Sequence, residues 1–267
     1  DGDQRGIVVR DSIDLQLLST TVTGSLSEPA LDIDNSGNLF PGIVILDDIA
    51  VHSTSSNYSV ILEGVDAEIS GLDLSGDGGG MYWGARGSLP SRISNSVIWD
   101  SPSNCLDLVS HTELLAEGVS LICDELPEID SSSVNFTASS LANRSGSNST
   151  FSLSNNSHLR WISSGDILTP ESSEDDVIAD VMWMVNVHTI NQNLLNIPLA
   201  QVNITFQEFE SEVLATQPYG GMFDYGPFVG ERWTPIQGWS STNTAYVGCD
   251  YDGVHNDSEP MQLDGDK

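Results

Sequence analysis

The feature that most constrains this chain is a repeat of short apolar runs with a period near 24 residues. The segments ISGLDLSGD, ISNSVIWDS and AEGVSLICD share an apolar–turn–apolar pattern that ends in an acidic residue or close to one. Leu74, Ile98 and Leu121 occupy equivalent positions in them, at spacings of 24 and 23 residues. Self-similarity at such a period indicates a solenoid, in which each repeat buries its apolar side against the next.

The turns and a second series of runs support the same register. Gly71, Asn95 and Gly118 stand at the turn, where residues that tolerate positive φ are favoured. The runs ALDID, SVILE and CLDLV precede their partners by some 15 to 25 residues, and LDDIAVHST fits the first series more loosely. We therefore expect two or three short strands per coil, stacked about 4.8 Å apart with Ile, Leu and Val in inward ladders.

This pattern resembles that of right-handed parallel β-helix proteins of the pectate-lyase-like type. The resemblance implies a parallel β-helix over residues 1–165. The alternative is a β-sandwich whose strands happen to be evenly spaced. Helical periodicity is almost absent from the sequence, so both alternatives make the chain all-β.

The sequence changes character after residue 165. Residues 166–176 are acidic and contain Pro170, which predicts a linker. Residues 177–267 resemble small Ig-like or carboxypeptidase-regulatory-like β-sandwich modules. The matching positions are Val185, Val187, Pro198, Leu199, Val202 and Ile204. The Asp-x-x-Gly turn of those modules is replaced by Asn191–Asn196, which leaves the exact family open.

The charge balance excludes several classes of partner. Acidic residues number 39 and basic ones 8, giving a net charge of −31, and Lys267 is the one lysine. Nucleic acids and anionic membranes need clustered cations, so neither is an expected partner. No run of about 18 apolar residues exists, so we expect no membrane insertion.

The same charge should make stability depend on salt, because salt screens the repulsion between the acidic side chains. Such a composition is expected of a protein from a saline habitat and equally of an ordinary acidic secreted protein.

Cysteines and sequons bear on covalent modification. Cys105 and Cys123 lie 18 residues apart within one repeat, so they can either form a disulfide or remain two free thiols. Cys249 then has no partner, and we expect it to be buried as a small hydrophobic residue. Seven N-x-[ST] sequons predict a glycoprotein. They are Asn57, Asn135, Asn143, Asn148, Asn155, Asn203 and Asn256.

Calcium is the one cofactor that the sequence suggests. Asp32, Asp34, Ser36 and Asn38 place oxygen atoms at alternate positions around a glycine, as in the first half of an EF-type loop. The bidentate Glu of such a loop is missing, because Ile43 stands at its position.

A glycine-rich stretch, GDGGG, is followed by Met81, Tyr82 and Trp83. It lacks the lysine of a phosphate loop, so we expect an inserted loop with aromatics folded over the helix surface. The alternative is a sugar-stacking platform made by Tyr82 and Trp83, whose faces can pack on pyranose rings.

Catalytic motifs are weak. Asp47 and Asp48 are adjacent, so on a strand they point to opposite faces and make a poor acid–base pair. Arg86, Arg92 and Arg160 are the local candidates for a lyase base, with no acidic cluster tied to them in sequence. The histidines are scattered, and neither zinc nor nucleophile motifs occur.

The sequence thus predicts an extracellular or cell-surface segment of a larger surface or filament-forming protein. Its role is structural or adhesive, without catalysis, and its expected partners are other copies of itself or surface polysaccharide. The alternative is a carbohydrate-binding or carbohydrate-active β-helix protein, either lyase or hydrolase.

Overall fold

The computed structural model contains strands and no helix in the part of the chain that it describes. Two compact units are formed: Asp1–Ala179 with Thr234–Ile236, and Asp180–Trp233 with Gln237–Lys267. No helix among these residues is long and apolar enough to cross a bilayer. The described residues are 6–12, 14–24, 28–37, 42–53, 58–74, 79–87, 89–99, 105–123, 125, 127–143, 151–162, 169–209, 212–218 and 220–264.

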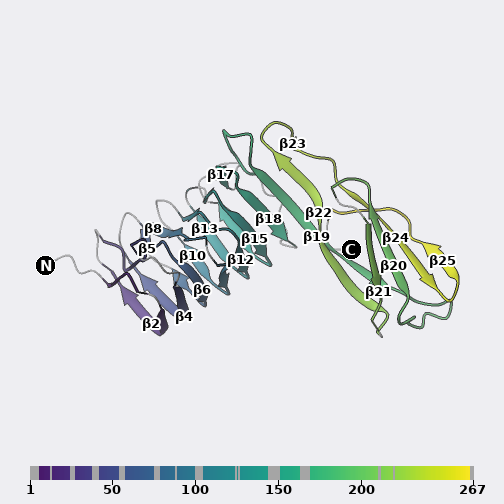
Figure 1. The fold of residues 1–267 in the computed structure, drawn as a ribbon, viewed down its shortest axis with the longest axis horizontal. Helices are drawn as coiled ribbons and strands as arrows, with labels where there is room; N and C mark the ends of the chain where they lie inside the picture. Colours follow the sequence, from purple (N-terminus) through teal and green to yellow (C-terminus); the bar gives the residue numbers. More distant parts are fainter. Residues whose placement is uncertain are drawn as a thin grey trace. The chain divides into compact units, whose positions relative to one another are not determined.

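The first unit is a parallel β-helix, as the repeat predicts, and its coils stack in chain order (Figure 1). One face is a seven-stranded parallel sheet. Its strands are β1 (Ile7–Arg10), β3 (Leu31–Asp34), β5 (Tyr58–Glu63), β8 (Gly79–Gly84), β11 (Leu106–Val109), β14 (Glu128–Asp130) and β17 (Ser152–Ser154).

The second and third faces follow the first in each coil. The second holds β6 (Asp66–Ser70), β9 (Ser91–Ser94), β12 (Leu114–Glu117), β15 (Ser133–Thr137) and β18 (His158–Ile162). The third holds β7 (Asp73–Leu74), β10 (Val97–Trp99), β13 (Ser120–Cys123) and β16 (Ser140–Asn143). Two longer strands, β2 (Leu15–Thr23) and β4 (Ile43–His52), run through both faces, because β4 pairs with β6 and then with β7.

The predicted ladder is confirmed residue by residue. Ile98 pairs in register with Leu74 on one side and Leu121 on the other. Their exposed fractions are 0%, 2% and 0%. The ladder continues through Val51 to Val22 at the other end, so one apolar column runs through successive coils.

The corners are held by backbone conformation and by serine. Gly71 and Gly118 have φ of 64° and 63°, and Asn95 has φ of 48°, as the turn positions predict. Buried serines satisfy the backbone groups that a corner leaves without a ladder partner. For example, Ser96, Ser132 and Ser139 accept hydrogen bonds from backbone N–H groups of the preceding coil at 3.1, 2.9 and 3.1 Å.

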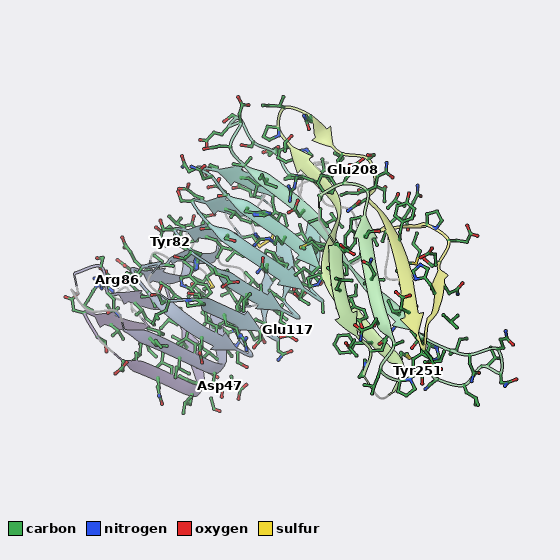
Figure 2. The ribbon with its side chains drawn as sticks, turned by 45° about the vertical axis from the view of Figure 1, so that its right-hand side comes forward. Asp47, Tyr82, Arg86, Glu117, Glu208 and Tyr251 are labelled. Carbon is green, nitrogen blue, oxygen red and sulfur yellow. A yellow bond between two sulfur atoms is a disulfide. The ribbon has the colours of Figure 1, made fainter. Side chains whose placement is uncertain are left out.

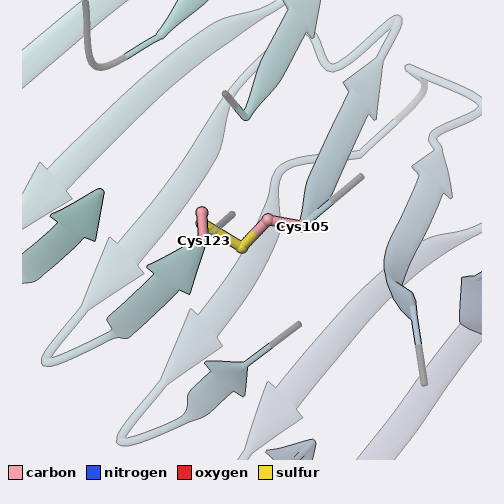
Figure 3. The surroundings of a disulfide bond; sticks show 2 residues. All are labelled: Cys105 and Cys123. Carbon is pink, nitrogen blue, oxygen red and sulfur yellow. A yellow bond between two sulfur atoms is a disulfide. The ribbon is translucent and has the colours of Figure 1, made fainter. Parts of the chain in front are cut away.

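A disulfide closes one coil on itself (Figure 3). Cys105 precedes β11 and Cys123 ends β13, and their Cα atoms lie 5.2 Å apart. Both residues are fully buried. The pairing that the sequence left open is therefore formed within the coil, where it ties the first face to the third.

The second unit is an antiparallel β-sandwich. One sheet contains β19 (Ile178–His188), β22 (Met222–Thr234) and β23 (Gly238–Trp239). The five-stranded sheet contains β20 (Gln201–Phe206), β21 (Glu212–Thr216), β24 (Thr244–Tyr251), β25 (Val254–Asp257) and β26 (Met261–Gln262). Alternate residues of β19, Val181 to Val187, share one core with Val202, Ile204 and Val247. An ion pair joins the buried Asp180 to the half-buried Arg232, with oxygen–nitrogen distances of 2.6 and 2.9 Å.

Candidate functional site

The first face of the β-helix carries a cluster of two tyrosines and two carboxyl groups on its outer side. Tyr82, Asp107 and Glu128 pair in register on the neighbouring strands β8, β11 and β14. Tyr58, from β5, donates a hydrogen bond from its hydroxyl to the Asp107 carboxylate. The rings of Tyr58 and Tyr82 lie 5.7 Å apart between centroids. These four residues are called the Tyr–Asp cluster below.

Asp107 is the unusual group of the cluster. Its residue is 7% exposed although its side chain faces outward from the coil. Burial, and then the negative charges of Glu128 and Glu125, raise the pKa of Asp107 to about 7. Burial likewise raises the pKa of Tyr82, with further contributions from Glu63 and Asp130.

A carboxyl group with this pKa can hold or release a proton near neutral pH, as a general acid or base requires. Glu128 is the register partner of Asp107 on the next strand, so a second carboxyl group lies on the same outer side of this face. Tyr82 is half-buried at the outer surface, where its ring can contact a sugar (Figure 2). The cluster therefore has the chemical groups for carbohydrate contact and for proton transfer.

The sugar-stacking prediction is wrong for Trp83. The stretch Gly79–Gly84 is a regular strand, β8, rather than an inserted loop. Trp83 consequently points into the coil, is 0% exposed, and donates from Nε1 to the Val65 carbonyl at 2.9 Å. Its neighbour Tyr82 points outward because side chains alternate along a strand.

Two of the four residues predicted to bind calcium, Asp32 and Asp34, lie beside an arginine side chain. Asp32 and Asp34 lie on the outer side of β3, where the Arg10 guanidinium pairs with Asp32 and lies 3.9 Å from Asp34. Ser36 donates its hydroxyl to Asp34 at 2.6 Å, and Asn38 lies outside the described residues. No group of three His, Cys, Asp or Glu side chains in the described part could hold a metal ion.

The sequons differ in accessibility. Asn155 and Asn256 are exposed, whereas Asn135 is half-buried on β15 and accepts a hydrogen bond from Arg160 at 3.1 Å. Asn203 is part-buried on β20, and its amide oxygen is buried without a hydrogen-bond partner. Asn57, Asn148 and the side chain of Asn143 lie outside what the structure describes.

The weaker catalytic candidates are not brought together. Asp47 is exposed on the second face, in the same column as Glu117 (Figure 2), and Asp48 forms the adjacent corner with φ of 55°. Arg92 and Arg160 also lie on the second face, in β9 and β18. Arg92 and Arg160 thus lie on a different face of the β-helix from Asp107.

Sequence reasoning missed Tyr58, Asp107 and Glu128. A usable signal was present, because the alignment of ALDID, SVILE and CLDLV already puts Asp107 between two inward leucines. Recognising GMYWG as one more coil of that series would have set Tyr82 beside Asp107. The hydrogen bond from Tyr58 spans 49 residues and has no local signature.

Comparisons with models of protein families, with curated proteins and with solved structures find no match to this chain.

Proposed function

We propose that this chain is a structural or adhesive segment of an extracellular or cell-surface protein. The observation that carries the proposal is the unbroken apolar ladder through Val22, Val51, Leu74, Ile98 and Leu121. Each coil rests on its neighbours, which produces a rigid unit whose surface, rather than a deep active site, is available for contacts.

The disulfide and the charge support an extracellular location. Disulfides such as Cys105–Cys123 persist in oxidising compartments and are rare in the cytosol. A net charge of −31 keeps such a surface soluble through self-repulsion. The exposed sequons Asn155 and Asn256 are the positions at which we expect glycans.

The proposal extends to the sandwich unit, which we infer to be an Ig-like or carboxypeptidase-regulatory-like spacer. Val185, Val187, Val202 and Ile204, which carry the resemblance, lie together in its core. Leu199 departs from the pattern, because it is 46% exposed.

The position of β1 at the edge of its sheet supports self-association, in which a second copy of the chain pairs with this strand. Among the described strands β1 stands at the end of the seven-stranded sheet, next to β3, and an edge strand can pair with another chain through its backbone. The N–H groups of Ile7 and Asp11 donate toward the next coil. Those of Val8 and Arg10 therefore point away from β3, because N–H groups alternate in direction along a strand.

Replacing Val8 by Pro removes one outward donor while sparing the bonds to β3. We expect the parent chain to associate over a hundredfold concentration range in sedimentation velocity, and Val8→Pro to shift the association to higher concentration. Leu214→Ser, at an exposed position of the sandwich, is the control and should sediment like the parent. A single monomeric species at every concentration would remove self-association from the proposal.

The Tyr–Asp cluster favours a second candidate function, a carbohydrate-active β-helix protein. The specific observation is the carboxyl group of Asp107, buried beside Glu128 with a pKa near neutrality. Acid–base chemistry on a glycan requires such a group.

A glycan-cleavage assay decides between the two functions. Incubation with pectin, alginate and neutral polysaccharides should release neither unsaturated nor reducing ends if the role is structural. Release that disappears in Asp107→Asn, and persists in the surface control Asp47→Asn, would replace the structural proposal by the carbohydrate-active one.

A further inference from the structure

The sandwich unit contains a groove on the side of β24 that faces away from its core. Ala245 and Val247 belong to the core, so the alternating Thr244 and Tyr246 point to the opposite side. The groove has a volume of about 700 Å³. Its lining residues are Gln207, Thr244, Tyr246, Pro260, Met261, Gln262 and Asp264.

The strand register builds a row of polar side chains across this groove. Thr244 pairs with Gln262 of β26 on one side. On the other side the backbone N–H of Gln207, which follows β20, donates to the Thr244 carbonyl at 2.9 Å. Two amides therefore flank one hydroxyl at strand spacing. Within the described part of the chain neither amide is engaged by another residue.

Tyr246 supplies the aromatic surface of the groove. Its residue is 44% exposed, and it pairs with Thr205 of β20, which fixes its backbone in the sheet. An exposed ring on a rigid strand offers a flat apolar face at small cost in conformational freedom.

The chemistry of the lining selects the class of ligand. Glutamine amides both donate and accept hydrogen bonds, a carboxylate accepts them, and the threonine hydroxyl does both, which matches the hydroxyl groups of a sugar. The described residues that line the groove include no Lys, Arg or His, and the chain carries a net charge of −31. Anionic ligands, including acidic polysaccharides, are therefore disfavoured. A single carboxylate, Asp264, also makes a poor metal site.

We propose that this groove binds a neutral oligosaccharide, with Tyr246 stacking on a pyranose ring and Gln207, Thr244 and Gln262 holding its hydroxyl groups. The inference rests on the proposed adhesive function and names its ligand class. The site is separate from the Tyr–Asp cluster, which belongs to the other unit.

The test is a binding measurement on the full chain. Isothermal titration with soluble glucan, mannan and galactan oligosaccharides, and with alginate oligosaccharides as the acidic comparison, should detect at least one neutral ligand and no acidic one. Tyr246→Ala should weaken the binding about tenfold. Tyr246→Phe should retain it, because the ring remains. Tyr251→Ala, on the same strand at 46% exposure and outside the lining, is the matched control.

Two results would overturn the inference: no neutral oligosaccharide binding to the parent chain, or undiminished binding by Tyr246→Ala. Either result leaves the structural role standing, since that role is tested by cleavage and by sedimentation. Cleavage of a bound oligosaccharide would instead overturn the proposed function while leaving the groove in place.

Discussion

Replacing Ile98 by Asp should lower the free energy of unfolding of the β-helix by at least about 4 kcal/mol. Ile98 is 0% exposed, and it lies between Leu74 and Leu121 of the adjoining coils. A carboxylate at this position has no cation or donor within the apolar column, so it is buried without compensation. Chemical denaturation followed by circular dichroism measures the loss.

Two matched substitutions test whether the loss of stability comes from the buried charge or from any change in β10. Ile98→Val removes one methylene and should cost about 1 kcal/mol. Val97→Asn lies on the same strand, where Val97 is 37% exposed, and should change stability by about 0.5 kcal/mol or less. If Ile98→Asp unfolds at the same denaturant concentration as Val97→Asn, the inward ladder is not what holds the coils together.

The coil register was predictable because every coil of a solenoid repeats the same requirements along the sequence. Each inward position needs an apolar side chain and each tight corner needs a residue that tolerates positive φ. Leu74, Ile98 and Leu121 therefore recur at the coil period, with Gly71 and Asn95 among the corners. The net charge did not help to predict this register, because acidic residues occupy outward positions, which the inward ladder does not constrain.

The coil containing Gly79–Gly84 was missed because local composition and tertiary pairing disagree there. Glycine disfavours an isolated strand, but β8 is paired on both sides, with β5 and β11, through backbone groups that need no side chain. That one error hid the inward position of Trp83 and the contact between Tyr82 and the Asp107 strand.

The buried serines also could not be predicted from the local sequence. A serine-rich sequence suggests solvated turns and glycan acceptors, yet Ser96, Ser132 and Ser139 are 1%, 2% and 5% exposed. Each accepts a backbone N–H from the coil before it, so part of the serine content serves the stacking itself. This role depends on a neighbour 20 or more residues away, which local sequence patterns do not reveal.

Two buried ionisable groups should give the β-helix opposing responses to pH between 4 and 7. His111 is 2% exposed, with Nε2 at 3.0 Å from the Trp83 carbonyl and its ring 4.8 Å from that indole. Burial lowers the pKa of His111 from its ordinary 6.5 to about 4, although the Trp83 carbonyl and the charge of Asp66 act in the other direction. Asp107 is displaced upward, from 3.8 to about 7.

The two shifts have opposite signs of linkage. The unfolded chain binds the His111 proton more tightly, so this contribution is complete above pH 6.5 and is lost as the pH falls toward 4, by about 3 kcal/mol. The folded chain binds the Asp107 proton more tightly, so stability is greatest below pH 3.8 and declines as the pH rises through 7. Because Asp107 lies at the outer side of its coil, solvent screening limits that decline to about 2 kcal/mol.

Single variants should therefore tilt the stability–pH profile in opposite directions. Relative to the parent chain, Asp107→Asn should gain stability progressively from pH 4 to pH 7, because it removes the penalty of ionising a buried carboxyl group. His111→Gln should lose a constant amount above pH 6.5, from the missing contact with Trp83, and should recover as the pH falls toward 4. Denaturant titrations at unit pH intervals give both difference curves. If the stability–pH profiles of both variants run parallel to that of the parent chain, the fold does not shift the pKa of either group.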